Sequence, residues 1–475
     1  MNRFYSYLEE RRLGPLWKQG VDLVSLEKVP AVADRAVVSG TWFFTTLLIA
    51  RYSDASQLGV YVVGISVLAV LVAFQDSFIF QPYTIKRHRP QGTPVGSLLI
   101  LSFLLSAGST LALTIGALEI LNRYGSSEMA LMTFAIAGAL PFVLTREFAR
   151  RTVLARLALG RAMLLELAAA TTQLSALGWL GLSGRMSAVS ACAALGGASA
   201  ITVAGWLYCT RAEFSVRIRQ VPTIFKQTWA VGKWLLIGQI AVQVQRHIIC
   251  WVAMLIAGAA VTGVYAACMS TLIFLSPLIF ALGNGLTPKL QLAWKNDGGQ
   301  GLWHETVRNT VLIASLILPL CLAVLVIGET VMRFLFPGTE YEGHRYALTV
   351  LALVMFSESL SMPASIALGV MERLRAIVMT GMVGAVLTAV LVWPLMRQWG
   401  LLGAACGSLG GAATIGIGVW VMFRLSVQKG YDPISAMHAL QNFTGFADSS
   451  SWKITRLGDG LHAETFLMQS NGALT

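Results

Sequence analysis

Long apolar segments alternate with short polar ones along most of the chain, and this pattern predicts a membrane protein made of helices. Each apolar segment has about 18–26 residues, and a helix needs about 20 to cross a bilayer. The twelve segments of that length span roughly residues 31–50, 58–80, 94–118, 129–146, 162–182, 187–209, 232–256, 261–286, 307–328, 346–369, 376–396 and 400–423. We therefore expect an all-α polytopic membrane protein with about twelve transmembrane helices.

The composition supports this class and excludes soluble enzymes. Of the 475 residues, 56% are hydrophobic and 12% are charged, whereas about 25% of a soluble domain is charged. So few charges could not cover the apolar surface of a water-soluble fold. The net charge of +12 comes from basic residues in short connections. That placement is typical of membrane orientation signals, so we expect no nucleic-acid partner.

The distribution of Lys and Arg predicts the orientation. With a cytoplasmic N-terminus, the cytoplasmic segments hold 25 of these residues and the outer loops hold 6. Such an excess is expected of cytoplasmic loops. An even number of helices then places both termini in the cytoplasm. The first 30 residues contain several charges and no early apolar region, so we expect the first helix to be an uncleaved anchor.

The longest cytoplasmic connection divides the helices into two sets of six. The longest outer loop, about residues 329–345, is too short for a folded catalytic domain, so we do not expect an enzyme. The predicted organisation is a cytoplasmic interfacial segment (1–30), an N-lobe (31–209), a cytoplasmic linker (210–231), a C-lobe (232–424) and a polar cytoplasmic tail (425–475).

A short motif near the start of the second helix recurs in the eighth. The sequence Leu-Gly-Val-Tyr at 58–61 is echoed by Thr-Gly-Val-Tyr at 262–265, and a proline follows each glycine after 23 and 25 residues. Six helices separate the copies, so the two halves have the same predicted topology. Transporters built from such parallel repeats bind their cargo between the halves, near the bilayer midplane.

The seventh helix carries the strongest candidate binding residues. Gln239, Gln243 and Arg246 follow at spacings of four and three, so they share one helical face, and His247 widens it. Arg246 lies near the bilayer centre, where a charge is costly unless it faces a cavity or a partner. A guanidinium suits a phosphate or carboxylate on the cargo. Two interpretations remain open: Arg246 faces cargo, or it pairs with Glu358 of the tenth helix. His247 is a hydrogen-bonding partner or a proton carrier.

A second group of charges lies at the cytoplasmic ends of the first two helices. Asp34 and Arg35 begin the first helix, and Asp76 lies near the end of the second. Antiparallel packing brings Arg35 and Asp76 to similar depth, either as a structural salt bridge or as a gate. The sequence contains no phosphate loop or metal-ligand cluster, so we expect no cofactor and no metal. The basic run 146–161 is expected to be a lipid-facing orientation signal that could also meet a cytosolic phosphate group.

Two stretches resemble the polysaccharide flippase and export family. The first is VQVQRHIICWVAMLIAGAAVTGVYAACMSTLIFLSPLIFALGNGLTPKL, at 242–290. The second is Arg146-Glu147-Phe148 followed by Arg150, Arg151 and Gly160-Arg161, which is similar to the family's basic loop after the fourth helix. This family belongs to the multidrug/oligosaccharidyl-lipid/polysaccharide exporter superfamily, which also includes multidrug-and-toxin extruders and lipid II flippases.

The resemblance implies a flippase that moves an undecaprenyl-diphosphate-linked oligosaccharide across the bacterial inner membrane by alternating access. The product would serve lipopolysaccharide or exopolysaccharide biosynthesis. The resemblance also implies two six-helix lobes around a cationic central cavity. By position, the residues that would line this cavity are Arg35, Asp76, Gln243 and Arg246. The implied partners are the lipid-linked oligosaccharide, membrane lipids and other polysaccharide-assembly proteins. The family often has an acidic residue beside the basic one in the seventh helix, whereas here the neighbours are Gln245 and His247.

Two other functions remain as alternatives. A multidrug or cation antiporter of the related extruder family needs acidic residues at the midplane, and in this interpretation only Glu358 qualifies. A membrane-embedded polymerase or glycosyltransferase acting on the same lipid-linked sugars needs a large outer loop. In the tail, residues 452–472 weakly resemble the strand, glycine loop and strand that open small kinase-like phosphotransferases, without the rest of that fold.

Overall fold

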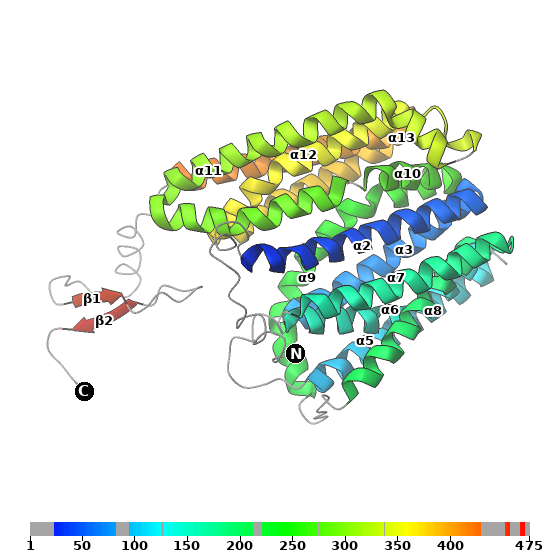
Figure 1. Cartoon of the computed structure of the whole chain (residues 1–475), viewed down its shortest axis with the longest axis horizontal. Coiled ribbons are helices and arrows are strands. Elements are labelled where there is room, and N and C mark those ends of the chain that lie inside the picture. The colour runs from blue at the N-terminus through cyan, green and yellow to red at the C-terminus, as the bar shows by residue number, and fades with distance from the viewer. Residues whose placement is uncertain are drawn as a thin grey trace, which may run out of the picture.

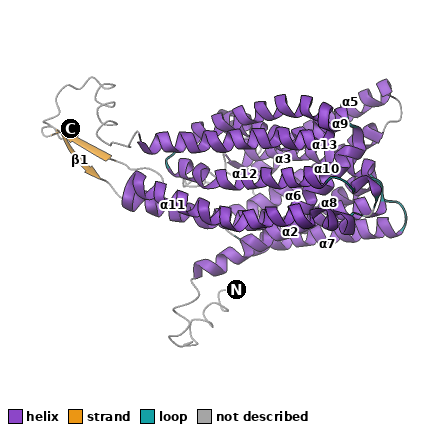
Figure 2. Ribbon diagram, turned by 90° about the horizontal axis from the view of Figure 1, so that it is seen from above, coloured by secondary structure: helices purple, strands orange, loops and turns teal. Residues whose placement is uncertain are grey.

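The protein is a bundle of long helices, described by a computed structural model. The described residues are 23–81, 95–124, 128–156, 158–211, 221–273, 275–336, 338–428, 452–456 and 466–470. In Figure 1, α11, α12 and α13 lie at the top, α5 to α8 at the bottom and α2 and α3 between them. Figure 2 shows the helices running roughly parallel to one another. Among the described residues, each of the twelve predicted apolar segments is helical. The chain is therefore the predicted all-α, multi-pass membrane protein.

The first six predicted segments correspond to separate helices. They are α2 (Leu23–Tyr52), α3 (Ala55–Gln75) continued by the π-helix η2 (Asp76–Phe80), α5 (Val95–Tyr124), α6 (Glu128–Ala155), α7 (Leu159–Leu182) and α8 (Ala188–Thr210). We keep the name N-lobe for α2 to α8, and C-lobe for the helices after them.

The later segments fall into fewer, longer helices. These are α9 (Val221–Ile256), α10 (Gly258–Leu272), α11 (Leu275–Leu335), the 3-10 turn η5 (Thr339–Tyr341), α12 (Arg345–Val370) and α13 (Leu374–Gln428). With 61 and 55 residues, α11 and α13 are each long enough for two crossings. Each changes direction at a glycine with positive φ, Gly298 at 61° and Gly400 at 57°. Only glycine adopts this backbone conformation without strain.

The eighth predicted segment, 261–286, is not one continuous helix. It divides into α10, which ends at Leu272, and the start of α11 at Leu275. Pro277 explains the break, because a proline lacks the N–H that would bond four residues back and its ring clashes with that carbonyl. The discontinuity lies in the helix that carries the second copy of the Gly-Val-Tyr motif.

The predicted linker is partly helical. We expected residues 210–231 to form a cytoplasmic linker. Instead α9 begins at Val221 and continues for 36 residues. Its first turns pack on η2, where the Phe78 ring contacts those of Phe225 and Trp229 at centroid distances of 5.6 and 5.2 Å. These aromatic contacts hold the start of α9 against the bundle.

The repeated motif forms a close crossing between the lobes. At Gly59 of α3 an added Cβ would overlap the carbonyl of Ala259 in α10, and at Gly263 of α10 it would overlap the carbonyl of Ala55 in α3. Both helices therefore carry Ala-x-x-x-Gly at the contact, a pattern of small residues that lets backbones approach closely. Tyr61 and Tyr265 are buried beside it. The equivalent positions of the two glycines support the predicted repeat.

The two ends of the bundle differ in their connections. One end, called here the Asp54 end, carries the turn 53–54 and the loop 338–344. The other, the tail end, carries the turn at Gly298 and the end of α13. In the C-terminal tail, Trp452–Arg456 (β1) pairs antiparallel with Phe466–Ser470 (β2), with Ile454 opposite Met468. These are the two strands that the resemblance in the tail implies, and residues 457–465 between them lie outside the described part. The first 22 residues lie outside the described part.

Candidate functional site

The site is built on α6, which is longer than the sequence analysis predicted. We expected this helix to end near 146 and the basic residues after it to form a lipid-facing loop, and this is wrong. The helix continues to Ala155, with no glycine or proline after Pro141 to interrupt it. Arg146, Glu147 and Arg150 therefore lie on a helix inside the N-lobe, with little exposed side-chain surface.

Four carboxylates and three guanidinium groups form an ion-pair network across α2, α6, α7 and η2. Its centre is Arg150, which donates to Asp34 on α2 at 2.7 Å and lies 3.3 Å from Glu166 on α7. Glu147 lies 3.8 Å from Arg150 and 3.9 Å from Arg146. Because buried charges are costly unless paired, this network ties these four elements together.

Asp76 has a partner that the sequence analysis did not predict. It lies on η2, and its carboxylate is 3.0 Å from Arg151 of α6. Gln81 donates a hydrogen bond to the other carboxylate oxygen at 3.2 Å. Asp76 therefore pairs with α6, and its expected pairing with Arg35 stays a prediction. The Arg35 side chain lies outside the described residues, although its backbone belongs to α2. Local π-helix is frequent at functional sites, because it re-aims a side chain within a helix.

A cavity of about 310 Å³ opens beside this network inside the N-lobe. Its walls come from α2, α3, α6, α7 and α8, and one side chain of α9, Gln243, also lines it. The polar residues that line it are Thr41, Trp42, Thr45, Tyr61, Arg146, Glu147, Glu166, Gln173 and Gln243. This volume falls at the lower end of the range for small-molecule sites, and convergent polar groups are typical of such sites.

Two hydrogen bonds fix the cavity walls. Gln173 of α7 donates to the Thr45 hydroxyl of α2 at 3.1 Å. Gln243 of α9 donates to the Ala69 carbonyl of α3 at 2.9 Å, across the boundary between the lobes. Close by, Trp251 donates to the Ser66 hydroxyl at 2.7 Å. A helix of the other lobe therefore forms part of the cavity wall.

Arg146 is the least engaged charge in the cavity wall. Its nearest carboxylate among the described residues is Glu147, at 3.9 Å, and its buried Nε has no hydrogen-bond partner there. The other two arginines of the network, Arg150 and Arg151, each have a carboxylate oxygen within 3.0 Å. A guanidinium held in place but poorly satisfied is free to bind a further acceptor.

The predicted residues of the seventh helix divide between two environments. Gln243 reaches the N-lobe cavity, and Gln239 is half-buried one turn earlier. Arg246 is exposed and interacts electrostatically with Glu358 of α12, which is also exposed. The His247 ring lies 6.1 Å from that of Trp251. The structure thus brings Arg246 and Glu358 together, without an ion pair within 4 Å among the described side chains.

Sequence reasoning missed most of the cavity residues, although signals for them exist. Glu166 lies five residues into a predicted span, and a carboxylate at that position is costly unless it has a partner. Arg146 and Arg150 are four apart, as are Glu147 and Arg151, so both pairs lie one turn apart on a helix. Gln173 follows Glu166 by seven residues on the same face. In the described ranges, no group of three or more His, Cys, Asp and Glu side chains is placed to hold a metal ion.

Comparison with known proteins identifies the fold. No protein-family model and no curated protein sequence matches the chain. Solved structures do match. The chain is similar to a multidrug resistance MATE family transporter of the MOP superfamily in its inward-facing conformation, with a TM-score of 0.62, 15% identity, and coverage of 86% of this chain and 96% of that one. For the outward-facing conformation of such a transporter, the TM-score is 0.60 at 14% identity, and the match covers 84% of this chain and 94% of that one.

A third similar structure is a MOP superfamily transporter from Pyrococcus furiosus, in which reversed polarity of the binding pocket suggests a different function. Its TM-score is 0.61 at 13% identity, and the match covers 84% of this chain and 94% of that one. The match spans nearly the full length of all three structures. The chain therefore has the fold of the MOP superfamily transporters.

Proposed function

We propose that the chain is a membrane transporter that works by alternating access and uses the N-lobe cavity as a binding site. The observation that carries this proposal is a cavity inside a membrane-spanning bundle, lined by Arg146, Glu147 and Glu166 and also by Gln243 from the other lobe. Buried charge costs stability, so charges beside a cavity are expected to have a role in binding. The similarity to MATE structures in inward- and outward-facing conformations is consistent with this proposal.

The contacts between the lobes suggest how the site opens. At the Asp54 end, α3 and α10 cross closely at Gly59 and Gly263. There Glu340 of η5 also accepts a hydrogen bond from the Ala55 N–H at 3.3 Å, next to the first turn of α3. Opening at this end requires both contacts to break. Opening at the tail end requires Phe78 to separate from Phe225 and Trp229.

We infer that the first candidate cargo is a cationic amphiphile, as in a multidrug extruder. The sequence analysis disfavoured this class because only Glu358 supplied an acid inside the membrane. The N-lobe network changes that premise, because it contains four carboxylates. Glu147 and Glu166 face the cavity directly. Carboxylates beside aromatic and apolar walls suit an organic cation, and a proton or sodium ion could exchange with it.

The experiment is transport by the purified chain in proteoliposomes. An imposed proton or sodium gradient should drive accumulation of a fluorescent organic cation. The Glu166→Gln variant should lose this transport, whereas Glu128→Gln, a change to an exposed residue far from the cavity, should keep it. Equal transport by the two variants, at equal protein levels, would contradict the role of the cavity.

The second candidate cargo is the lipid-linked oligosaccharide that the sequence resemblance implies. Two observations favour it: Arg146 is poorly satisfied inside the cavity, and Arg246 is exposed on α9. Either guanidinium could bind a diphosphate. The test is whether lipid-linked saccharides accumulate in cells that lack the gene, and whether Arg246→Ala fails to restore export while Arg246→Lys does. Normal export with Arg246→Ala would remove this residue from the mechanism.

A further inference from the structure

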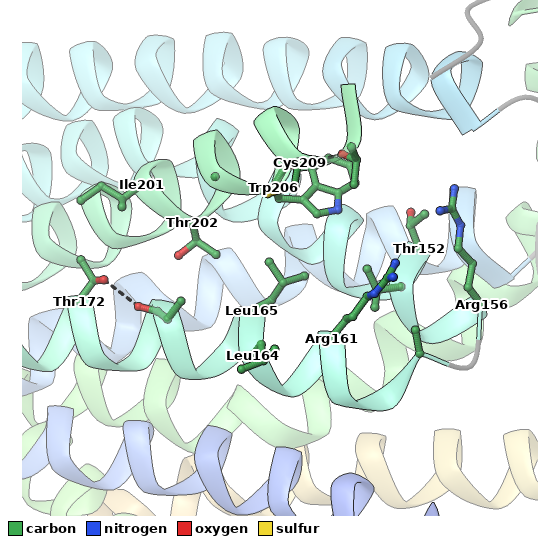
Figure 3. A pocket seen from close by; sticks show the side chains of 15 residues that line it. Thr152, Arg156, Arg161, Leu164, Leu165, Thr172, Ile201, Thr202, Trp206 and Cys209 are labelled. Carbon is green, nitrogen blue, oxygen red and sulfur yellow. Dashed lines mark hydrogen bonds between the residues drawn. The ribbon is translucent and has the colours of Figure 1, made fainter. Parts of the chain in front are cut away.

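The N-lobe cavity brings both signs of charge into one small space. Arg146 and Glu147 are neighbours on α6, and both line it, together with Glu166 of α7. Figure 3 shows another, larger hollow of the N-lobe, between α6, α7 and α8, whose charged lining residues Arg156 and Arg161 are both basic. The two hollows share no lining residue. Mixed charge therefore distinguishes the cavity from this other hollow.

Arg146 and Glu147 do not satisfy each other. Consecutive residues of a helix point about 100° apart, so their side chains do not face one another. The guanidinium and the carboxylate lie 3.9 Å apart, which is too far for a hydrogen bond. Neither side chain makes a hydrogen bond to another described residue, and the buried Nε of Arg146 has no partner there. A donor and an acceptor thus remain for a ligand.

The neighbouring charges of the network are already engaged with one another. Arg150 lies 2.7 Å from Asp34 and 3.3 Å from Glu166. It lies farther from Glu147, at 3.8 Å. Two acids therefore share the Arg150 guanidinium, and Glu147 is left with weaker contacts. Of the three charged residues that line the cavity, Arg146 and Glu147 are the two that are open to a ligand.

The rest of the cavity wall is mostly apolar. The rings of Trp42 and Tyr61 line it, with aliphatic side chains from α3, α6 and α8. Thr41 donates to a backbone carbonyl of its own helix, and Gln173 donates to Thr45, so these polar groups have partners. The volume of about 310 Å³ suits a small ligand. Such a ligand would combine a dipolar end with an apolar remainder.

We propose that the N-lobe cavity binds a small zwitterion, an α-amino acid with an apolar side chain. Its carboxylate accepts from the Arg146 guanidinium, its ammonium donates to Glu147, and its side chain lies against Trp42 and Tyr61. A ligand with only a positive group at Glu147 would be repelled by Arg146, and one with only a negative group would be repelled by Glu147. A zwitterion avoids both costs.

This inference rests on the proposed use of the cavity as a binding site and names the class of its cargo. It narrows the two candidate cargoes, because each of them uses only one of the two charges.

The test measures the binding of three probes to the full chain, purified in detergent. L-Phenylalanine carries both charges, its methyl ester carries only the ammonium, and N-acetyl-L-phenylalanine carries only the carboxylate. Isothermal titration calorimetry should give phenylalanine an affinity about 10- to 100-fold higher than either analogue, as expected for the loss of a hydrogen bond between charged groups.

Equal or tighter binding of either analogue would overturn the inference and leave the cavity as a binding site for that analogue. If no probe binds, the inference also fails. Transport of the organic cation then decides separately whether the cavity is used.

Single charge-removing variants test the two anchors. Arg146→Gln should lower the affinity for phenylalanine about 10- to 100-fold, and the methyl ester should become the preferred probe. Glu147→Gln should instead make the N-acetyl probe preferred. Misfolding would weaken all three probes alike, so a reversed preference identifies a role in binding. Arg161→Gln, at an exposed position in the other hollow, is the matched control and should bind phenylalanine as the wild type does. An unchanged preference in both anchor variants would overturn the inference.

Discussion

Gly59 of α3 and Gly263 of α10 occupy equivalent positions in one helix crossing, each facing a backbone carbonyl of the other helix. Gly59 faces Ala259, and Gly263 faces Ala55. Each copy of the repeated Gly-Val-Tyr motif thus makes the same kind of close contact with the other helix. The repeat in the sequence therefore has a structural cause, because both copies must lack a side chain for the backbones to meet.

A side chain at either glycine should separate the two helices. We expect Gly59→Leu and Gly263→Leu each to lower the stability of the protein by about 1–3 kcal/mol, the usual cost of overpacking a well-packed contact. The measurement is thermal unfolding in detergent, followed by intrinsic fluorescence.

The matched control is Gly40→Leu on α2, where a Cβ would contact nothing within 4 Å. Its unfolding temperature should stay close to that of the wild type, since a leucine has a better helix propensity than glycine. If Gly59→Leu unfolds at the same temperature as Gly40→Leu, the close crossing does not exist.

Glu340 should favour closure of the Asp54 end. Its carboxylate accepts from the Ala55 N–H, next to the positive end of the α3 dipole. Such a charge contributes about 0.3–1 kcal/mol at an exposed position. We therefore expect Glu340→Gln to raise the population that is open at this end about two- to five-fold.

Labelling of a buried position measures this opening. Thr262 is fully buried beside the crossing, so in a background without native cysteines Thr262→Cys should react with a maleimide only when the end opens. Glu340→Gln should increase the labelling rate. Glu342→Gln, on the same loop but paired with Arg333 at 3.9 Å, should not. An unchanged rate with Glu340→Gln would show that this hydrogen bond does not hold the end closed.

Asp76 should be coupled energetically to Arg151. The two lie 3.0 Å apart, and the Arg151 side chain is 38% exposed, so solvent screening limits the interaction. We expect a double-mutant cycle with Asp76→Asn and Arg151→Gln to give a coupling of about 0.5–1 kcal/mol in the free energy of unfolding. The same cycle with Arg35→Gln should give a smaller value. A larger coupling with Arg35 would instead support the gate that the sequence analysis predicted there.

The sequence predicted the helices well and the charged site poorly, for different physical reasons. Apolar length alone defines a span, so segments such as 129–146 and 162–182 could be located directly. The end of α6 could not, because the positive-inside rule assigns clustered arginines to a loop. Arg150 is instead neutralised by acids that come from other helices, Asp34 and Glu166. Such pairing depends on tertiary structure and is invisible to a hydropathy pattern.

Two breaks in the helices differ in whether the local sequence predicts them. The end of α10 could have been predicted, because Pro277 is a local signal. The π-helix at Asp76 has no comparable local signal in its sequence, Asp-Ser-Phe-Ile-Phe. The π-helix packs on α9, where Gly232 lies close to the Ser77 carbonyl. The irregular turn is thus accompanied by a contact between residues more than 150 positions apart, which no local pattern can reveal.

Gln243 links the two lobes at the cavity, so it should matter more to transport than to folding. Leucine has a similar volume and cannot donate to the Ala69 carbonyl. A neutral hydrogen bond contributes about 0.5–1.5 kcal/mol. If that bond closes the cavity over the bound cargo, Gln243→Leu should lower the transport rate about 2- to 10-fold, while the protein still inserts and unfolds at a similar temperature.

Gln239→Leu, one turn earlier on α9 and outside the cavity wall, should keep the wild-type rate. Equal rates for the two variants would mean that closure by α9 does not limit transport, and the cavity would then have to work within the N-lobe alone.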